Sequence, residues 1–223
     1  KRGILEANLQ GEFLGVKYDL QSIEAATRDN TAKPCVIVVA ASDEAVLRIA
    51  SKYPQLPILS ILSSSNRLRA ECAPNVFHTM PSQQMFSDAL AQWRSKHPDS
   101  SPKAQAWHPK FRKYAAAQLN SRFHETFGVN MDDAAWAGWA ATKLIADTLI
   151  RSPALSGNDL LAELKTNLAF DGQKGIDMRF RETGQLAQPL LLIEDGKIVG
   201  EAPVRGVASI TDLDSLGVVN CPK

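Results

Sequence analysis

The sequence has no surplus of charge of either sign. Its 223 residues include 25 Lys or Arg and 24 Asp or Glu, which gives a formal net charge of +1. Proteins that attach electrostatically to nucleic acids or anionic membranes carry a basic surplus or a basic stripe. The balance excludes a footprint of that kind, and we expect no nucleic-acid partner.

Long apolar runs are also lacking. The longest helical apolar stretch, residues 134–150, is interrupted by Lys143 and Asp147, and no run approaches the ~20 residues that span a bilayer. No signal peptide is visible. Because the sequence begins at Lys1 within an expected helix, we expect a mature or truncated form.

The motifs of common enzymes and nucleotide sites are missing. The chain contains no G-x-S-x-G, no H-E-x-x-H, no phosphate loop and no G-x-G-x-x-G. Its histidines show no metal-ligand spacing among themselves or with the cysteines, and Asp132 and Asp133 are better explained as helix caps. We therefore expect a protein that is not an enzyme and holds neither a metal nor a cofactor.

Cysteine is scarce, with three residues in the chain. Cys35 opens an apolar run and is most simply a small core residue. Cys72 and Cys221 lie in polar, proline-containing segments, which makes them the better candidates for a disulfide. The spacing leaves a Cys35–Cys72 pair open as the alternative. A disulfide would imply an oxidising compartment.

One pattern repeats three times between residues 35 and 82. Apolar runs at 35–40, 56–62 and 76–78 each end in a small polar cluster. Short apolar runs without alternation are typical of strands buried on both faces, and a helical stretch at 44–52 separates the first two. This spacing predicts βαβ units and a parallel sheet. Ligands bind outside the carboxyl ends of such strands, so the pattern favours a small-molecule site.

Helices dominate the expected structure on either side of this pattern. The first, at 2–12, is expected to bury Ile4, Leu5 and Leu9, and a half-exposed strand is expected at 14–21. The other predicted segments are a helix or loop at 22–32 and helices at 85–96 with Ser82 as N-cap, 109–127 ending at Gly128, 132–150 and 157–168.

The last part of the chain changes to strands. Alternation predicts a strand at 176–180, followed by a turn at Thr183 and Gly184. Two further strands, 188–194 and 197–199, are joined by Asp195 and Gly196, a dipeptide typical of a type I′ hairpin. A C-terminal β-hairpin is therefore expected.

The polar clusters after the apolar runs supply candidate ligand contacts. Ser42 precedes a helix whose unpaired N–H groups attract an anion, although Asp43 opposes this. The cluster after the second run offers hydroxyl, amide and guanidinium donors to a carboxylate. It consists of Ser63, Ser64, Ser65 and Asn66, with Arg67 and Arg69 supplying the charge. The structural alternative is that all of these are ordinary caps and turns.

Aromatic side chains are a second source of candidates. Trp136 lies three residues before Trp139 on one expected helix, so the two face roughly the same way. Core packing is the simplest role for them. The alternative is an aromatic wall that stacks on a flat ligand, for which Trp107 and Trp136 are the candidates.

Segments covering well over half of the chain match one family in the family's order. They are RGILEANLQGEFLGVKYDL, VIVVAASDEAV, LPILSILSSSNRLR, NVFHTMPSQQMFSDALAQW, AWHPKFRKYAAAQLNSRF, DDAAWAGWAATKLIADTL and FDGQKGIDMRFRETGQLAQPLLL. The chain resembles a type I periplasmic solute-binding protein of the branched-chain amino-acid-binding class of ABC transporters. It is most similar to the subgroup associated with alcohol oxidation dependent on pyrroloquinoline quinone (PQQ).

The resemblance implies a fold, a location and a set of contacts. The fold is α/β: a flavodoxin-like parallel-sheet lobe with added helices and the C-terminal β-hairpin. The location is periplasmic, with a membrane ABC permease as partner. First-lobe ligand contacts of the family fall on Ser42, Ser63, Ser64, Ser65 and Thr79, while Trp107 and His108 match the return crossover.

The chain departs from the family in two ways. The family's first strand is absent, because Lys1 already lies at the first helix. Most of the second lobe, which the family has between Trp93 and Trp107, is also absent, and the break at 97–103, with two prolines and two serines, occupies its place. We predict a single lobe over 1–223 with a linker at 97–103. A second copy, in a homodimer, would replace the missing lobe.

Two functions from different classes follow. The first is a solute-binding component, or a one-lobe relative, that binds a small anionic metabolite such as an amino acid or a PQQ-like carboxylate; PQQ enters as a candidate ligand. The alternative is a dimeric periplasmic interaction module, accessory to a PQQ-dependent oxidation system. A hydrolase or redox enzyme on the same sheet has only fold analogy behind it.

Overall fold

Three short parallel strands form the first sheet of the computed structural model, which describes residues 2–12, 15–22 and 34–221. The strands are β1 (Ile37–Val39), β2 (Ile58–Ser60) and β3 (Val76–His78), in the order β1-β2-β3. Ile37 pairs with Ile58, and Ile58 with Val76. The parallel sheet expected from the three apolar runs is therefore confirmed. Most of the expected helix or loop at 22–32 lies outside the described residues.

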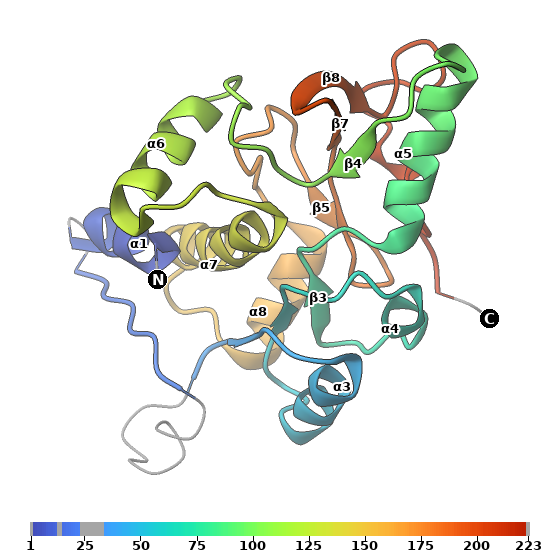
Figure 1. Ribbon diagram of the computed structural model, residues 1–223. Coiled ribbons are helices and arrows are strands. Elements are labelled where there is room, and N and C mark those ends of the chain that lie inside the picture. The colour runs from blue at the N-terminus through green and yellow to red at the C-terminus, as the bar shows by residue number, and fades with distance from the viewer. Residues whose placement is uncertain (1, 13–14, 23–33, 222–223) are drawn as a thin grey trace.

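Two helices connect these strands. α3 (Asp43–Lys52) follows β1, and α4 (Asn66–Ala70) follows β2; both lie beside the strands in Figure 1. Val46 of α3 and Leu68 of α4 pack against Ile58 in one buried cluster. The helices thus cover strands that are apolar on both faces and need to be shielded from water.

A second sheet is antiparallel and lies at the other end of the molecule (Figure 1). Its strands are β4 (Lys103–Gln105), β7 (Leu190–Glu194) and β8 (Lys197–Ala202), in the order β4-β7-β8. α5 (Gln83–Lys96) packs on this sheet through Met85 and other apolar side chains. One helix therefore joins the end of the parallel sheet to the antiparallel one.

The β7–β8 hairpin turns through Asp195 and Gly196. Their φ angles are 50° and 67°, and a type I′ turn requires positive φ at both central positions. The predicted hairpin is confirmed, and β8 continues to Ala202.

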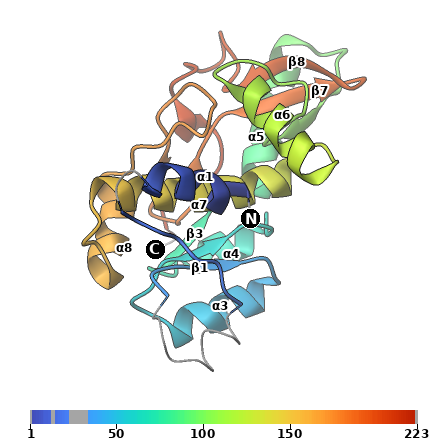
Figure 2. The ribbon, with the colours of Figure 1, turned by 90° about the vertical axis from the view of Figure 1, so that its left-hand side faces the viewer.

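Four helices build the remaining layer, with α7 (Asp133–Arg151) at its centre. The other three are α1 (Arg2–Gly11), α6 (Ala116–Phe127) and α8 (Gly157–Thr166), and α7 buries both of its tryptophans. α1 lies along α7 in both views (Figures 1 and 2). Asp132 accepts a hydrogen bond from the backbone N–H of Ala135 at 2.8 Å, so it is the N-cap expected from the sequence.

A small hairpin extends the parallel sheet beyond β3. It consists of β5 (Arg179–Phe180) and β6 (Leu186–Ala187), and Gln185 bridges to His78 in a parallel sense. Its turn, at Thr183 and Gly184, lies where the sequence predicts one. A short 3-10 helix, η2 (Leu213–Ser215), precedes the C-terminal segment.

The C-terminal segment is tied to the end of α4. Cys72 and Cys221 form a disulfide across 149 residues of sequence, with their Cα atoms 6.0 Å apart. Cys35 is a free thiol. The pair is the one that the sequence favours over Cys35–Cys72.

The inward face of α1 differs from the predicted one. Leu5 is 51% exposed and Leu9 is 64% exposed, whereas Gly3 and Ala7 are buried. A Cβ on Gly3 would lie 1.7 Å from Thr142 Oγ1 of α7. Small residues let the two helix backbones approach closely, and this closeness turns the leucines outward.

Several other segments differ from those predicted from the sequence. Residues 15–21 form no strand, and the backbone N–H of Tyr18 instead donates to Asn8 Oδ1 at 2.7 Å. α6 begins at Ala116 rather than at 109, since Tyr114 and Ala115 have positive φ. The sequence pattern does not predict α4, because this helix has only five residues. The linker expected at 97–103 is a loop up to 102, and Lys103 begins β4.

Candidate functional site

The loops after β1 and β2 meet at the carboxyl edge of the parallel sheet, as expected. Ser63 Oγ donates to Asp43 Oδ1 at 2.6 Å, and the backbone N–H of Ser65 donates to Ser63 Oγ at 3.2 Å. We call Ser42, Asp43, Ser63, Ser64 and Ser65 the edge cluster. The Ser63 hydroxyl is thus held in place by Asp43 and by the backbone N–H of Ser65.

Two serines of the edge cluster cap helices. Ser42 accepts from the backbone N–H of Ala45 at 3.4 Å at the start of α3, and Ser65 accepts from that of Leu68 at 3.3 Å at the start of α4. Ser64 contributes its carbonyl, which accepts from the backbone N–H of Gln83 at 2.7 Å. Capping satisfies helix N–H groups that otherwise lack partners.

Asp43 carries the negative charge of the edge cluster. Partial burial by itself would raise the pKa of this carboxyl, but hydrogen bonds from Ser63 and Ser65 and the charges of Arg67 and Arg69 bring the pKa below its ordinary value. A protein carboxylate therefore already occupies hydroxyl donors that a ligand carboxylate would use.

Arg67 points outward. Its guanidinium forms an ion pair with Glu44 at 2.7 Å, and both side chains are about two-thirds exposed, at 67% and 69%. Thr79 lies inward: it is fully buried, and its Oγ1 donates to the carbonyl of Ala137 at 3.0 Å. Neither side chain lines either of the two cavities described below.

The predicted aromatic wall lies inside the core. Trp107 and Trp136 are 1% and 0% exposed and stack on each other with ring centroids 6.0 Å apart. The indole N–H of Trp107 donates to Asn120 Oδ1 at 2.8 Å. On the other side, the Lys174 ammonium lies 3.9 Å from the Trp136 ring, and burial lowers its pKa to about 7. The pair is thus packed within the protein.

His108 is half-buried near the start of this aromatic group. Its Nδ1 accepts from the backbone N–H of Lys110 at 3.2 Å. Burial and the charge of Lys110 lower the pKa of its imidazole. His78 is buried in β3, and burial together with the charge of Arg69 holds its pKa well below the usual range.

Arg69 connects the edge cluster to a cavity behind α4. It is 4% exposed, and its guanidinium donates to the carbonyls of Ser63, Ser65 and Met80 and to Gln185 Oε1, at 2.7–3.0 Å. All four acceptors are neutral oxygens. Burial lowers the pKa of Arg69 to about 9, so the guanidinium remains charged near neutral pH.

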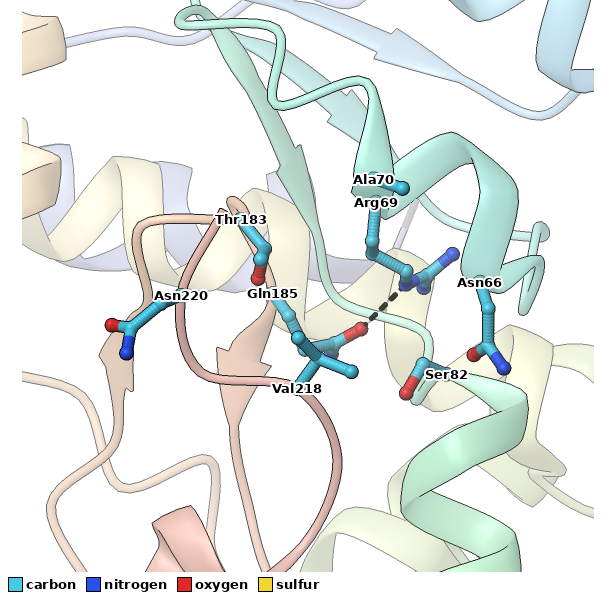
Figure 3. A pocket seen from close by; sticks show the side chains of 8 residues that line it. All are labelled: Asn66, Arg69, Ala70, Ser82, Thr183, Gln185, Val218 and Asn220. Atoms are coloured by element: carbon cyan, nitrogen blue, oxygen red, sulfur yellow. Dashed lines mark hydrogen bonds between the residues drawn. The ribbon is translucent and has the colours of Figure 1, made fainter. Parts of the chain in front are cut away.

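The cavity has a volume of about 200 Å³. Side chains of α4 and of the start of α5 form one wall, and the β5–β6 turn and the C-terminal segment form the other (Figure 3). Its lining residues are Asn66, Arg69, Ala70, Ser82, Thr183, Gln185, Val218 and Asn220. Of the residues expected from the sequence to meet a ligand, Asn66 and Arg69 line it.

The pairing of the cysteines points to this cavity. A bridge between Cys72 and Cys221 places residues 218–221 beside the end of α4, and hence beside Arg69. The β5–β6 turn lies there because Gln185 pairs with β3. No short-range sequence pattern predicts this pairing.

A second hollow lies on the far side of α7. It is wider, at about 450 Å³, and more open, with Trp139, the Lys143–Asp147 ion pair and Asp171 among its lining residues. Within the described part of the chain, no group of three or more His, Cys, Asp or Glu side chains is arranged to hold a metal ion. No described helix combines the length and apolar character needed to cross a membrane.

Comparison with known proteins places the fold. No protein-family model and no curated protein matches the chain. Among solved structures, an ABC-type branched-chain amino acid transporter protein from Rhodopseudomonas palustris CGA009 matches with a TM-score of 0.68 at 11% identity. The match covers 99% of this chain and 94% of that one.

Two further structures agree with this fold. A solute-binding protein of an ABC transporter from Rhodopseudomonas palustris BisB5, in complex with 3,4-dihydroxybenzoic acid, has a TM-score of 0.67 at 11% identity, covering 90% of this chain and 89% of that one. A periplasmic ligand-binding protein of a branched-chain amino acid ABC transporter from Burkholderia xenovorans LB400 has a TM-score of 0.65 at 10% identity, with 90% of each chain covered. The chain therefore has the mixed α/β fold of periplasmic binding proteins.

Proposed function

We propose that this protein is the solute-binding component of a periplasmic ABC-type uptake system and binds a small anionic metabolite. One observation carries the proposal: a small, partly open cavity with a buried, charged arginine lies behind the carboxyl edge of the parallel sheet. In open parallel sheets, ligands bind outside the carboxyl ends of the strands. The fold shared with solute-binding proteins supports this role.

The size of the cavity supports a small solute. Pockets for drug-sized ligands measure about 300–1,000 Å³, whereas this cavity has about 200 Å³. An amino-acid-sized molecule suits that volume better than the three fused rings of PQQ. The PQQ-related subgroup and PQQ as ligand remain predictions from the resemblance.

A binding role also suits the chemistry of the edge cluster better than catalysis does. In the edge cluster the Ser63 hydroxyl donates to Asp43 and not to a histidine, so the cluster lacks the paired nucleophile and base that acyl transfer needs. Its hydroxyls instead hold Asp43 and helix termini. We therefore propose a protein that is not an enzyme.

Native mass spectrometry of the freshly purified protein tests the proposal, followed by titration with amino acids, small carboxylates and PQQ. A releasable small mass, or saturable binding of one panel member, is the expected result. A protein that carries no extra mass and binds no panel member would refute solute binding.

Two variants then locate the solute relative to the edge cluster. If it contacts the cluster directly, Ser63→Ala and Arg67→Ala weaken binding about tenfold, or about 1.4 kcal/mol. Ser95→Ala, on the exposed side of α5, is the matched control. Unchanged affinity in both variants would remove the edge cluster from the contact surface.

A dimeric periplasmic interaction module is the second candidate, and the outer face of α1 favours it. Leu5 and Leu9 are more than half exposed there, and paired apolar faces of this kind associate in homodimers. If this candidate is correct, the protein is a dimer that binds no solute, and a Leu5→Glu, Leu9→Glu variant is a monomer. A partner in a PQQ-dependent oxidation system remains a prediction from the resemblance.

A further inference from the structure

The cavity behind α4 holds a buried charge that its neighbours do not neutralise. The guanidinium of Arg69 donates to one side-chain amide and three backbone carbonyls. An arginine has five N–H donors, so one remains for another acceptor. Among the described residues, no carboxylate forms an ion pair with Arg69; Asp43 acts on it from beyond ion-pair distance. A buried charge solvated only by neutral oxygens is stabilised by an anion beside it.

The opposite wall offers a hydroxyl without a partner. Thr183 lines the cavity and is 3% exposed, and its Oγ1 has no hydrogen-bond partner. Leaving a buried hydroxyl unpaired is costly, so an unpaired hydroxyl at a cavity wall points to a ligand group. Figure 3 shows Thr183 across the cavity from Asn66 and Ser82.

The backbone around Thr183 is fixed. Gly184 has φ of +73°, and a Cβ at this position would lie 2.1 Å from the carbonyl oxygen of Val76. The backbone N–H of His78 donates to the carbonyl of Gly184 at 2.8 Å. This close approach to β3 requires glycine and sets the position of the threonine beside it.

The outer wall is fixed as well. The backbone N–H of Gly217 donates to Asp88 at 2.6 Å, and that of Cys221 donates to Glu182 at 3.0 Å. The Cys72–Cys221 disulfide closes the segment between them onto α4. Val218 and Asn220 therefore face the cavity from a segment held at both ends.

The lining selects against a positive charge on the ligand. It contains one guanidinium, amide and hydroxyl groups, and the apolar side chains of Ala70 and Val218, but no carboxylate. An α-ammonium group would lack a charged partner and would lie near Arg69. Like charges close together at a poorly hydrated site cost binding free energy.

We propose that this cavity is a subsite for a small monocarboxylate that lacks an amino group. The carboxylate accepts from the remaining N–H of Arg69 and from the hydroxyl of Thr183, while the apolar end of the ligand contacts Ala70 and Val218. The C-terminal segment, held by the disulfide, closes the subsite. This inference rests on the proposed solute-binding role and names the class of solute.

The test compares butyrate with 2-aminobutyrate by isothermal titration to the full chain. We expect saturable butyrate binding and at least tenfold weaker binding of 2-aminobutyrate. Thr183→Val should weaken butyrate binding about tenfold, as expected for loss of one hydrogen bond to a charged group. Thr211→Val, at an exposed threonine, should leave it unchanged.

A second pair of variants tests the cavity by filling it. Ala70→Leu places three carbons in the space and should abolish butyrate binding, whereas Ala91→Leu, exposed on α5, should not. Thermal denaturation confirms that each variant folds.

The outcomes separate this inference from the proposed function. Binding of some other solute, unaffected by Thr183→Val and Ala70→Leu, would overturn the subsite and leave the solute-binding role intact. Equal or tighter binding of 2-aminobutyrate would overturn the ligand class. No binding of any small molecule would refute both.

Discussion

The edge cluster and the cavity behind α4 lie on either side of Arg69 and use similar polar groups in different ways. In the edge cluster, hydroxyls, backbone N–H groups and one carboxylate satisfy one another. In the cavity, Thr183 Oγ1 has no partner and Arg69 retains an N–H. Polar groups that are satisfied internally stabilise the fold, whereas unsatisfied ones at a cavity wall remain available to a ligand.

The comparison shows why the position of a polar residue after a strand does not identify a contact. Serines follow β1 and β2 as the rule for parallel sheets leads one to expect. Two of them cap helices, and Ser63 holds Asp43. The unsatisfied hydroxyl belongs to a turn about 100 residues later in the chain, and the remaining N–H belongs to Arg69 of α4.

The largest expected effect comes from opening the outer wall of the cavity. Replacing both Cys72 and Cys221 with serine removes a link across 149 residues, and a loop of this length predicts a loss of about 5 kcal/mol in the free energy of unfolding. Urea denaturation of the variant and the parent measures it. Cys35→Ser is the control, and an effect of equal size there would contradict the assignment to the disulfide.

The next effect comes from the turn that positions Thr183. Gly184→Ala should lower the free energy of unfolding by about 3 kcal/mol. The new Cβ would clash with the Val76 carbonyl, and alanine is unfavourable at the positive φ of this position. Gly128→Ala is a matched control with a φ of +70° and open space around the Cβ; it should cost about 1 kcal/mol. Equal losses in the two variants would show that the turn is not constrained by β3.

A smaller effect is expected in the edge cluster, where Asp43 has a lowered pKa. A carboxyl whose pKa is lower in the folded state contributes stability above its unfolded pKa and loses it as pH falls through the folded pKa. The stability of the parent should therefore fall below about pH 4 more steeply than that of Asp43→Asn. At pH 7 the variant should lose less than about 1 kcal/mol, because the site is partly solvated.

Denaturation series between pH 2.5 and 7 would check this, with Asp99→Asn in an exposed loop as control. Superimposable pH profiles for Asp43→Asn and the parent would show that Asp43 has no stabilising role in the edge cluster.

Local sequence patterns predicted the elements that depend on local interactions. The three apolar runs gave the parallel strands, Ser82 and Asp132 gave helix starts, and Asp195 with Gly196 gave the hairpin turn. Each rests on burial, capping or backbone geometry within a few residues. The fold class followed from these elements.

Features that depend on contacts between distant segments were not predicted. α1 turns Leu5 and Leu9 outward because Gly3 allows close contact with α7, and hydrophobicity alone ranks leucine above glycine for burial. The cavity joins α4 to Thr183 and to residues close to the C-terminus. The Cys72–Cys221 pair is the feature of the sequence that brings the C-terminal segment to α4.

An effect of similar size is expected from two buried threonines that differ in one respect. Thr79 Oγ1 donates to the carbonyl of Ala137, while Thr183 Oγ1 has no partner. Valine has nearly the same shape, so Thr79→Val should cost about 1 kcal/mol for the lost hydrogen bond. Thr183→Val should cost nothing or stabilise slightly, because it removes an unsatisfied hydroxyl. Urea denaturation without added ligand measures both. A clear loss of stability in Thr183→Val would mean that its hydroxyl already has a partner in the folded protein, and the contrast between the edge cluster and the cavity would then fail.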